Sequence, residues 1–419
     1  MRILFFTDHF WPEPSAPAAH VFERCQLWAR WGHQVTVVCA APNFPEGKLF
    51  PGYRNRWRHV EAIKGVRVVR VKTFIHPNEG FLFRILDYLS YAVSAFSFAH
   101  LEPKPEVVIS TSPHLFVPLG AAAYARLRRV PHVAEIRDLW PATIVATGAM
   151  KKGLSYRLLE RIELGIYAAS ARIISLTHSF AEDMTARGVP RAKIDVVISG
   201  ANLELFQPRP REEQLAAALG LTGRFVVGYL GTVGLAHGLE NALAAAELLR
   251  GAPVTFLIVG TGAAKAGLEQ LARANQLSNV VFVGAQAKEQ MPCYWSVCDA
   301  ALIHLKNSDT FKTVIPSKIF ESMAMGLPIL YVGPTGEGSR LVEAHEAGLA
   351  VPPADPPALA AAIRRFLDAP ALRQRLAENS RRSAPKFSRV RQARDSLASL
   401  ARALGKEVLE REGVVTLAS

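Results

Sequence analysis

The sequence predicts an α/β protein of two domains, each built on a doubly wound parallel sheet. Short apolar runs alternate with helical patterns along the whole chain. The alternation pauses at residues 200–211, where a Gln-Pro-Arg-Pro stretch indicates a linker, and then begins again. The 419 residues, half of them apolar, are also too many for one typical domain. We therefore expect domains at residues 1–200 and 201–385, followed by a helix and tail at 386–419 that return toward the first domain.

The first half contains a series of short strands, most of them apolar throughout. A buried strand at residues 2–7 is followed by a helix at 18–31 that ends at Gly32. Further strands are expected at residues 34–40, 66–71, 106–110, 132–136, 173–176 and 195–198. Because strands without polar alternation are buried on both faces, they favour a parallel sheet covered by helices on both sides.

The second half repeats this pattern and adds glycine-rich turns. A strand at residues 225–230 runs directly into Gly231-Thr232-Val233-Gly234. Helices are expected at 239–249 and 264–274, and strands at 254–259, 280–283, 300–304 and 329–332. Ligands of such sheets bind beyond the carboxyl ends of the strands, so we expect two domains that face a common cleft.

Residues 311–330 carry the strongest local indication of a binding site. Pro316, Ser317 and Lys318 stand at the start of an apolar helix that carries one acid, Glu321. Free N–H groups at a helix start, together with a lysine, suit a phosphate, and an acid about one turn further on suits hydroxyl groups. This combination fits a nucleotide with its ribose. An ordinary capped helix with a surface lysine and glutamate fits the same residues.

The composition limits the classes of partner and the compartment. The net charge of +13, which leans toward the N-terminal half, favours anionic partners, but no aromatic-basic motif indicates nucleic acid. The cysteines, at positions 25, 39, 293 and 298, form no metal-type cluster, so we expect free thiols and no metal. The N-terminus has no signal-peptide layout. These features predict a cytoplasmic protein, at or near the inner face of the cytoplasmic membrane.

Two segments suggest contact with a membrane surface. Residues 81–101 are strongly apolar, but Arg84 and Asp87 leave a run shorter than the roughly 20 residues of a membrane span. They therefore form either a buried helix or a helix at an anionic membrane surface. Basic residues also surround Trp57, namely Arg54, Arg56, Arg58 and His59. This cluster is either a solvated loop or a contact with lipid headgroups or a lipid diphosphate.

Several motifs, taken in order, resemble the retaining glycosyltransferases of family 4, which have the GT-B fold. They are GHQVTVV at 32–38, GANLELF at 200–206, FVG at 282–284 and ESMAMGLP at 321–328. A narrower likeness rests on PNFPEGK at 42–48, RDLWP at 137–141 and PSKIFE at 316–321. These motifs resemble the fucosyl- and N-acetylfucosaminyl-transferases of bacterial polysaccharide assembly. The resemblance extends from the first residue to about residue 387.

The resemblance implies that residues 201–385 hold a nucleotide-sugar donor and that residues 1–200 bind the acceptor. Glu321 matches an acid that accepts hydrogen bonds from ribose hydroxyls in this family. Other matching positions are Gly231, Thr232 and Gly234 at the pyrophosphate turn, Gly284 and Ala285 near the base, and Ser15 and Ala16 in a loop that faces the donor phosphates.

The chain departs from the family pattern at positions that normally carry charge. Thr313 replaces the first acid of the E-x7-E motif, and Thr232 and His237 stand where arginine and lysine are usual. Two positive charges that normally neutralise the leaving diphosphate are thus missing. Lys318, with Ser317 and Pro316 beside it, is the expected substitute.

Three further residues follow predicted strands and are candidates for catalysis. Asp138 would orient the acceptor hydroxyl, Arg137 would hold an acceptor phosphate, and His114 would face the sugar. A buried ion pair that fixes a loop accounts equally for Arg137 and Asp138, and a surface histidine for His114.

The resemblance implies transfer with retention of configuration from a nucleotide sugar, with UDP favoured over GDP and no cofactor or metal required. The expected acceptor is a glycan or a polyprenyl-diphosphate-linked glycan, and the sugar a deoxy or N-acetyl-deoxy hexose. Two alternatives stay open at this point. One is a nucleotide-sugar epimerase, and the other is a binding module without catalysis.

Overall fold

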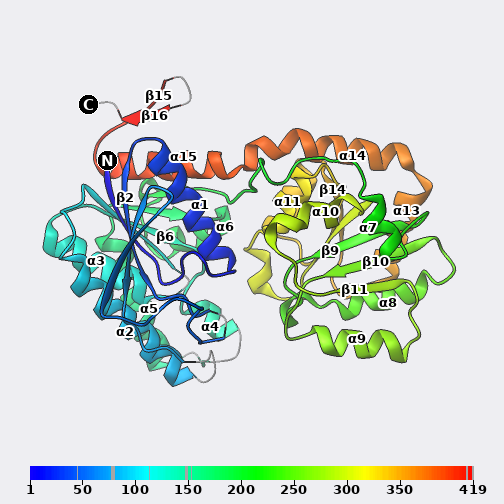
Figure 1. Ribbon diagram of the computed structural model, residues 1–419, viewed down its shortest axis with the longest axis horizontal. Coiled ribbons are helices and arrows are strands. Elements are labelled where there is room, and N and C mark those ends of the chain that lie inside the picture. The colour runs from blue at the N-terminus through cyan, green and yellow to red at the C-terminus, as the bar shows by residue number, and fades with distance from the viewer. Residues whose placement is uncertain are drawn as a thin grey trace. The chain divides into compact units, whose positions relative to one another are not determined.

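The protein folds into two compact units, seen in a computed structural model that describes residues 1–44, 46–76, 81–112, 114–146, 150–151, 153–411 and 414–417 (Figure 1). Unit 1 contains Met1–Ile198 together with Gln392–Ser419, and unit 2 is Ser199–Arg391. The chain thus returns to unit 1 after it has completed unit 2.

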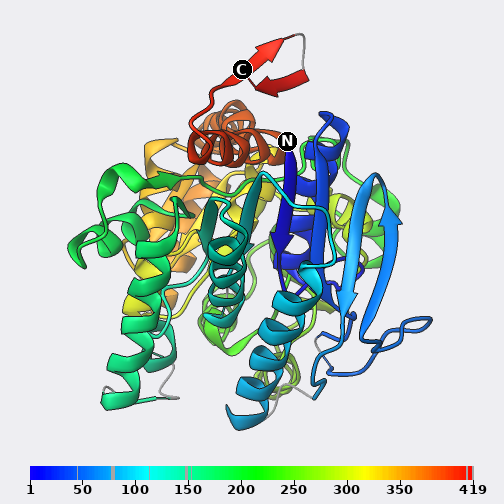
Figure 2. The same ribbon diagram turned by 90° about the vertical axis from the view of Figure 1, so that its left-hand side faces the viewer.

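Unit 1 is built on a sheet with the strand order β3-β4-β2-β1-β5-β6-β7-β8. Its strands are β1 (Arg2–Phe6), β2 (Gln34–Ala40), β3 (Arg58–Ile63), β4 (Val66–Val71), β5 (Val107–Thr111), β6 (His132–Ile136), β7 (Arg172–Ser175) and β8 (Ile194–Val196). Neighbouring strands are parallel except at one edge, where β3 runs antiparallel to β4. Figure 2 shows this pair, in light blue, at one margin of the sheet.

Helices cover both faces of this sheet because its strands are apolar on both sides. The helices are α1 (Ala16–Arg30), α2 (Phe81–Ala99), α3 (Phe116–Arg128), α4 (Ala142–Ala146), α5 (Leu154–Ala169), α6 (His178–Ala186) and α15 (Arg389–Ala403). Phe5 and Trp28 belong to the core on the α1 and α15 side. Phe6 and Tyr124 belong to the core on the α2 and α3 side. Successive residues of β1 therefore serve opposite cores, as the alternation of a strand requires.

Unit 2 is built on a parallel sheet with the order β11-β10-β9-β12-β13-β14. Its strands are β9 (Phe225–Leu230), β10 (Val254–Val259), β11 (Val280–Val283), β12 (Ala300–His304), β13 (Ile329–Val332) and β14 (Gly348–Val351). Its helices are α7 (Glu213–Ala218), α8 (Glu240–Leu248), α9 (Lys265–Ala274), α10 (Met291–Ser296), α11 (Lys318–Ala324), α12 (Glu337–Ala344), α13 (Pro356–Asp368) and α14 (Pro370–Ser383). Val227 and Tyr229 of β9 pack into the core with α8 and α13, and Cys298 after α10 lies against Gly228 on the opposite face.

The predicted α/β class with parallel, doubly wound sheets is confirmed, with one antiparallel edge strand added. The predicted helix and tail at 386–419 contain a strand pair that was not predicted. After α15 ends, β15 (Val408–Arg411) pairs with β16 (Val414–Leu417) in a hairpin. The edge strands β3 and β14 were not predicted, because the alternating polar residues of β3 and the glycine and alanine of β14 give a weak sequence pattern.

Helix α2 is buried on one side only, and contact of residues 81–101 with a membrane stays a prediction. Tyr91 and Ala95 are buried in the core of unit 1, whereas Phe83, Leu86 and Val93 are exposed on the opposite side of the helix. No helix among the residues that the structure describes has the length and apolar character needed to cross a bilayer.

Each sheet has one position where the strand order reverses. In unit 1 the chain proceeds outward from β1 through β2 to β4, and then in the other direction from β5. In unit 2 the reversal lies between β9 and β12. The loops that leave two such strands turn to opposite faces of the sheet, which opens a crevice at the carboxyl ends. The fold therefore predicts one binding position in each unit.

A buried ion pair connects α1, β6 and α15. Arg24 contacts Glu135 at 2.6 and 3.0 Å and donates to Ser396 Oγ at 3.1 Å. Burial alone would raise the pKa of Glu135, but the attraction and hydrogen bonds of Arg24 lower it below its usual value. The return of the chain to unit 1 is thus fixed partly by a charged contact in the core.

We expect Arg24→Met to lower the free energy of unfolding by about 3 kcal/mol, because Glu135 keeps its burial and loses its main partner. Urea denaturation followed by circular dichroism measures this change. Arg250→Met is the control, since the Arg250–Glu247 pair is exposed and worth less than about 1 kcal/mol. Equal effects of the two substitutions would contradict the conclusion that Arg24 and Glu135 form a stabilising buried ion pair.

Candidate functional site

Two glycine-rich loops pack backbone against backbone where the strand order of unit 2 reverses. The N–H of Gly231, after β9, donates to the last carbonyl of β10 at 2.8 Å. Gly260 and Gly262, after β10, have φ values of 143° and 155°. A Cβ on Gly260 would lie 1.9 Å from the Gly231 carbonyl oxygen, and one on Gly262 would lie 2.4 Å from that of Val233. Only glycine allows this approach, so the second loop fixes the shape of the turn at 231–234.

Lys318 lies directly against this turn. Its ammonium nitrogen is 4.8 Å from the centroid of the Tyr229 ring, and a Cβ on Gly231 would lie 2.8 Å from Lys318 Cε. Burial lowers the pKa of Lys318 to about 8, although the charge of Glu321 acts in the opposite direction. The side chain is therefore held in place by packing, with a charge that burial makes costly.

The helix behind Lys318 is shorter than the sequence indicates. α11 begins at Lys318 and has seven residues, so Pro316 precedes the helix and does not lie in its first turn. Ser317 is the N-cap residue but makes no side-chain cap hydrogen bond. Such a short helix adds little field of its own, so the ammonium and the backbone N–H groups carry the anion-binding capacity. Glu321 lies in the first turn, as predicted.

Thr232 and His237, which stand where the family usually has charged residues, carry no charge in the structure. His237 Nδ1 accepts from the Gly234 N–H at 3.3 Å, and burial lowers the pKa of His237 to about 4, helped by the nearby charge of Lys318. The Thr232 carbonyl accepts from the Tyr229 hydroxyl at 2.6 Å. Neither position replaces a missing cation, so Lys318 is the group that brings positive charge to this turn.

Three other predicted donor-binding residues, Thr313, Gly284 and Ala285, have no demonstrated contact with a donor. Thr313 Oγ1 donates to the Thr310 carbonyl of its own turn at 3.0 Å, so it stabilises the loop before α11. Gly284 and Ala285 are exposed at the carboxyl end of β11, and a Cβ on Gly284 would meet nothing within 4 Å. Their contact with a base stays a prediction.

A second group of polar residues lies where the strand order of unit 1 reverses. His114, after β5, is 2% exposed, so its interpretation as a surface histidine is wrong. Its Nε2 is 3.3 Å from Asp8 Oδ2, after β1, and its ring stacks on Tyr88 of α2 at 3.8 Å. Three elements of unit 1 thus converge on this histidine.

His114 and Tyr88 border a pocket of ≈ 270 Å³. It is lined by His9, Ser15, Pro17, Asn43, Phe44, Gly47, His76, Phe83, Arg84, Asp87, Tyr88, His114 and Trp140. Ser15 Oγ also accepts from the Ala18 N–H at 3.3 Å as the N-cap of α1, which begins at Ala16. The predicted contact of Ser15 and Ala16 with donor phosphates stays a prediction. The sequence singled out Ser15 and His114 here, and it missed the contribution of α2.

Arg137 and Asp138 follow β6 but do not line this pocket. Arg137 contacts Glu135 at 3.7 Å and His20 Nδ1 at 3.1 Å, so its ion-pair partner is Glu135 and not Asp138. Burial raises the pKa of Asp138 to about 6, against the opposing charge of Arg137. Their predicted roles toward an acceptor stay predictions.

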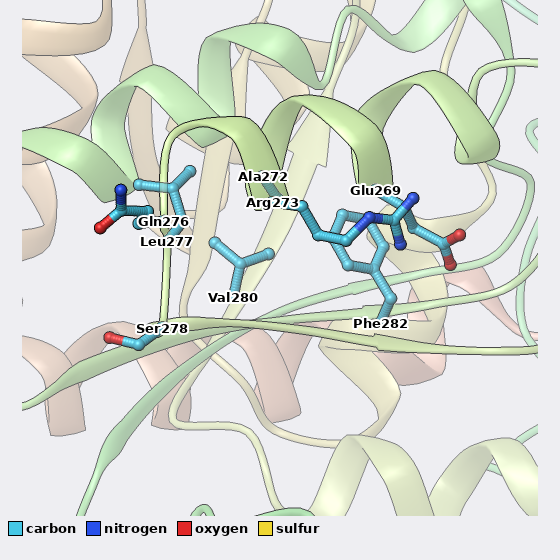
Figure 3. Close-up of a pocket in the computed structure, with 8 residues that line it drawn as sticks. All are labelled: Glu269, Ala272, Arg273, Gln276, Leu277, Ser278, Val280 and Phe282. Carbon is cyan, nitrogen blue, oxygen red and sulfur yellow. The ribbon is translucent and has the colours of Figure 1, made fainter.

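A larger pocket of ≈ 430 Å³ lies between α9 and β11 in unit 2 (Figure 3). Figure 3 shows Glu269 and Arg273, from α9, beside the Phe282 ring. β11 is an edge strand, so this pocket is away from the β9–β12 reversal, and none of the predicted site residues lines it. Among the described residues, no group of three or more His, Cys, Asp or Glu side chains is arranged to hold a metal ion.

Comparison with known proteins identifies the family. A family model described as Glycosyl transferase 4-like domain matches residues 15–200, and one described as Glycosyl transferases group 1 matches residues 211–383. The sucrose-phosphate synthase of Thermosynechococcus elongatus superposes with a TM-score of 0.74, over 97% of this chain and 99% of that chain, at 22% identity. The chain belongs to the GT-B glycosyltransferases.

Two further similarities concern individual proteins. The putative colanic acid biosynthesis glycosyl transferase WcaI of Escherichia coli K12 is 26% identical over 335 residues, which are 78% of this chain and 82% of WcaI. The Anabaena protein HepE, solved in complex with UDP, superposes with a TM-score of 0.71 at 17% identity. That match covers 96% of this glycosyltransferase and 100% of HepE.

The pKa of Lys318 predicts how affinity for a diphosphate depends on pH. Because the folded pKa is lowered to about 8, the ammonium loses its proton as the pH rises through 8. We expect the affinity for UDP to be constant below this value and to fall above it. Calorimetric titration with UDP between about pH 7 and pH 9.5 measures the change in affinity. A Lys318→Arg variant serves as the reference, because arginine keeps its charge over this whole range. An unchanged wild-type affinity across this range would exclude a role for the ammonium.

Proposed function

We propose that this glycosyltransferase moves a sugar, with retention of configuration, from a UDP-sugar to a glycan or polyprenyl-diphosphate-linked acceptor in polysaccharide assembly. The observation that carries the proposal is the position of Lys318 against the Gly231 turn, with Glu321 in the same helical turn. The complex of HepE with UDP supports the choice of nucleotide. The name of WcaI, which refers to colanic acid biosynthesis, supports the polysaccharide context.

The donor chemistry follows from the groups at this position. Breaking the sugar–phosphate bond places negative charge on the departing diphosphate, and a fixed cation with backbone N–H groups stabilises that charge. Lys318 and the turn at 231–234 provide both in unit 2. Glu321, when ionised, only accepts hydrogen bonds, which suits the ribose hydroxyls. The leaving phosphate would take the proton of the acceptor hydroxyl, which attacks from the same face of the sugar.

The proposed sugar is a deoxy or N-acetyl-deoxy hexose. Support for it comes from the likeness of PNFPEGK, RDLWP and PSKIFE to the fucosyl- and N-acetylfucosaminyl-transferase branch. The acceptor is assigned to unit 1, where the pocket beside His114 offers aromatic and polar groups together. In this proposal Arg137 and Asp138 position the acceptor from the loop after β6.

We further propose that unit 1 contacts the anionic inner face of the cytoplasmic membrane. Phe83, Leu86 and Val93 form an exposed apolar stripe on α2. Trp57 is 66% exposed, and Lys72 Nζ lies 4.5 Å from the centroid of its ring. Exposed tryptophan and leucine beside basic residues are typical of peripheral membrane contact.

The membrane contact is tested with a triple Arg54→Ala, Arg56→Ala, Lys72→Ala variant. Arg58 is left unchanged because it is paired with Glu102 at 2.7 Å. We expect flotation with vesicles rich in phosphatidylglycerol to weaken strongly, since each basic residue near an anionic surface contributes about 1 kcal/mol.

The matched control for this test lies in unit 2, where Arg340, Arg375 and Arg382 are exposed. Their triple alanine variant has the same net charge as the test variant. Equal flotation of the two variants would show that overall charge, and not this surface of unit 1, governs binding.

The transfer reaction is tested by incubating the purified protein with a panel of nucleotide sugars, with and without a lipid-diphosphate sugar. We expect nucleotide release that depends on the acceptor. Lys318→Met should reduce kcat/KM at least about 100-fold, because the leaving diphosphate loses its fixed cation. Lys312→Met is the control, since Lys312 is exposed and pairs with Asp309 at 2.7 Å in the same loop. Acceptor-free isomerisation of the sugar would indicate an epimerase, and binding without turnover a module.

A further inference from the structure

His114, which lines the pocket of unit 1, has a buried ring nitrogen that no described residue satisfies. His114 Nε2 faces the Asp8 carboxylate, whereas its Nδ1 is buried without a partner. Burial would raise the pKa of Asp8, but the hydrogen bond with His114 lowers it. Burial also lowers the pKa of His114. An ionised Asp8 can only accept, so Nε2 carries the single proton and Nδ1 presents a lone pair.

A carboxylate on α2 offers a second acceptor to the same pocket. Asp87 is half-buried, and no donor among the described residues is hydrogen-bonded to its carboxylate. Burial, with the nearby charge of Asp8, raises the pKa of Asp87 to about 7. Arg84, three residues earlier on the same helix, also lines the pocket. α2 therefore presents one acceptor and one donor to the pocket, on neighbouring turns.

The other acid near this pocket is already saturated. Glu13 Oε2 is 2.8 Å from His9 Nδ1, and Glu13 Oε1 accepts from the backbone N–H groups of Asn43 and Phe44 at 2.9 and 3.0 Å. Burial would lower the pKa of His9, but Glu13 and Asp8 raise it to about 9. His9 and Glu13 therefore neutralise each other, and both carboxylate oxygens of Glu13 are already engaged.

Aromatic rings form much of the remaining wall. Phe44, Phe83, Tyr88 and Trp140 line the pocket together with His76, whose ring lies 4.2 Å from that of Phe83. Flat apolar surfaces beside a few convergent polar groups suit a sugar ring, which has C–H faces and hydroxyl edges. The volume of ≈ 270 Å³ lies just below the roughly 300–1,000 Å³ of pockets for drug-sized ligands, so it fits one small ring.

We propose that this pocket binds a neutral sugar ring of the acceptor, with Asp87 and His114 Nδ1 accepting hydrogen bonds from two of its hydroxyls. Arg84 donates to a ring or hydroxyl oxygen of the same sugar. The assignment rests on the proposed transfer function, because it takes the pocket as the acceptor site. It identifies Asp87 as a specificity-determining residue.

Charges of both signs border the pocket. Asp87 and Arg84 line it, and Asp8 lies behind His114. An acidic group of a sugar placed against Asp87 and the lone pair of His114 would meet two acceptors, whereas a hydroxyl group donates to both without bringing charge. On this side the pocket therefore favours a hydroxyl group over a carboxylate or a phosphate.

The kinetic test uses the full chain with Asp87→Asn, which keeps the size of the side chain and removes its charge. We expect the acceptor KM to rise about ten- to a hundredfold, as for loss of a hydrogen bond to a charged group, with UDP affinity unchanged. Asp183→Asn on α6 is the matched control, since Asp183 is a surface acid of unit 1 outside the pocket. An unchanged acceptor KM, or a change in UDP affinity alone, overturns the proposal.

A second measurement separates this proposal from the transfer function. Saturation-transfer NMR of the donor-free protein is recorded with methyl hexosides and with the matching methyl hexuronides. We expect wild type to bind the neutral glycosides more tightly than the hexuronides, and Asp87→Asn and Arg84→Gln to bind the neutral glycosides more weakly. If these variants lose binding but the wild type transfers no sugar, the assignment of the pocket as a sugar site is supported and the proposed transfer function is refuted. Equal binding of hexosides and hexuronides, or variants that bind like wild type, refutes the pocket assignment.

Discussion

The close approach of two backbones in unit 2 determines the shape of its binding position. The Gly231 carbonyl lies where a side chain at residue 260 would have to be, and the Val233 carbonyl has the same relation to residue 262. Because both β9 and β10 end at this point, the two loops fix each other, and neither turn has freedom to move away from the sheet. Lys318 then packs across Gly231, where any side chain would displace it. The position of one charge is thus set by the absence of side chains at three glycines.

This arrangement holds a cation where it is costly in the free protein. The Tyr229 ring attracts the ammonium, but such contacts are worth only about 0.5–2 kcal/mol, and burial opposes the charge. A bound diphosphate would stabilise the ammonium group, whose charge burial disfavours. The unfavourable free energy of burying this charge in the free protein would then be partly offset when the ligand binds. Groups placed in this way before the ligand arrives need little reorganisation during reaction. The lowered pKa and the fixed position of Lys318 are two consequences of the same packing.

The sequence predicted the strands that are apolar on both faces and failed where that pattern was weak. β9, β10 and β12 were predicted with their observed bounds. β3 and β14 lie at sheet edges; β3 alternates polar and apolar residues, and β14 contains a glycine and an alanine. Lys318 and Glu321 could be found because they are close together in the sequence. The role of Gly260 could not be found in this way, because Gly231, against which it packs, follows a different strand. Asp87 appeared only as an interruption of an apolar run, since the pocket it lines is assembled from distant segments.

The two strand-order reversals carry opposite chemistry, although they occupy equivalent places in similar sheets. In unit 2 the reversal offers an ammonium and backbone N–H groups, which bind an anion. In unit 1 it offers Asp87 and the lone pair of His114, which can accept from hydroxyl groups, with the donor Arg84 on the same helix as Asp87. A diphosphate has no hydrogen to donate to these acceptors, and a sugar hydroxyl gains little from a fixed cation. The proposed division of the donor and the acceptor between the units therefore matches the hydrogen-bonding groups at each reversal.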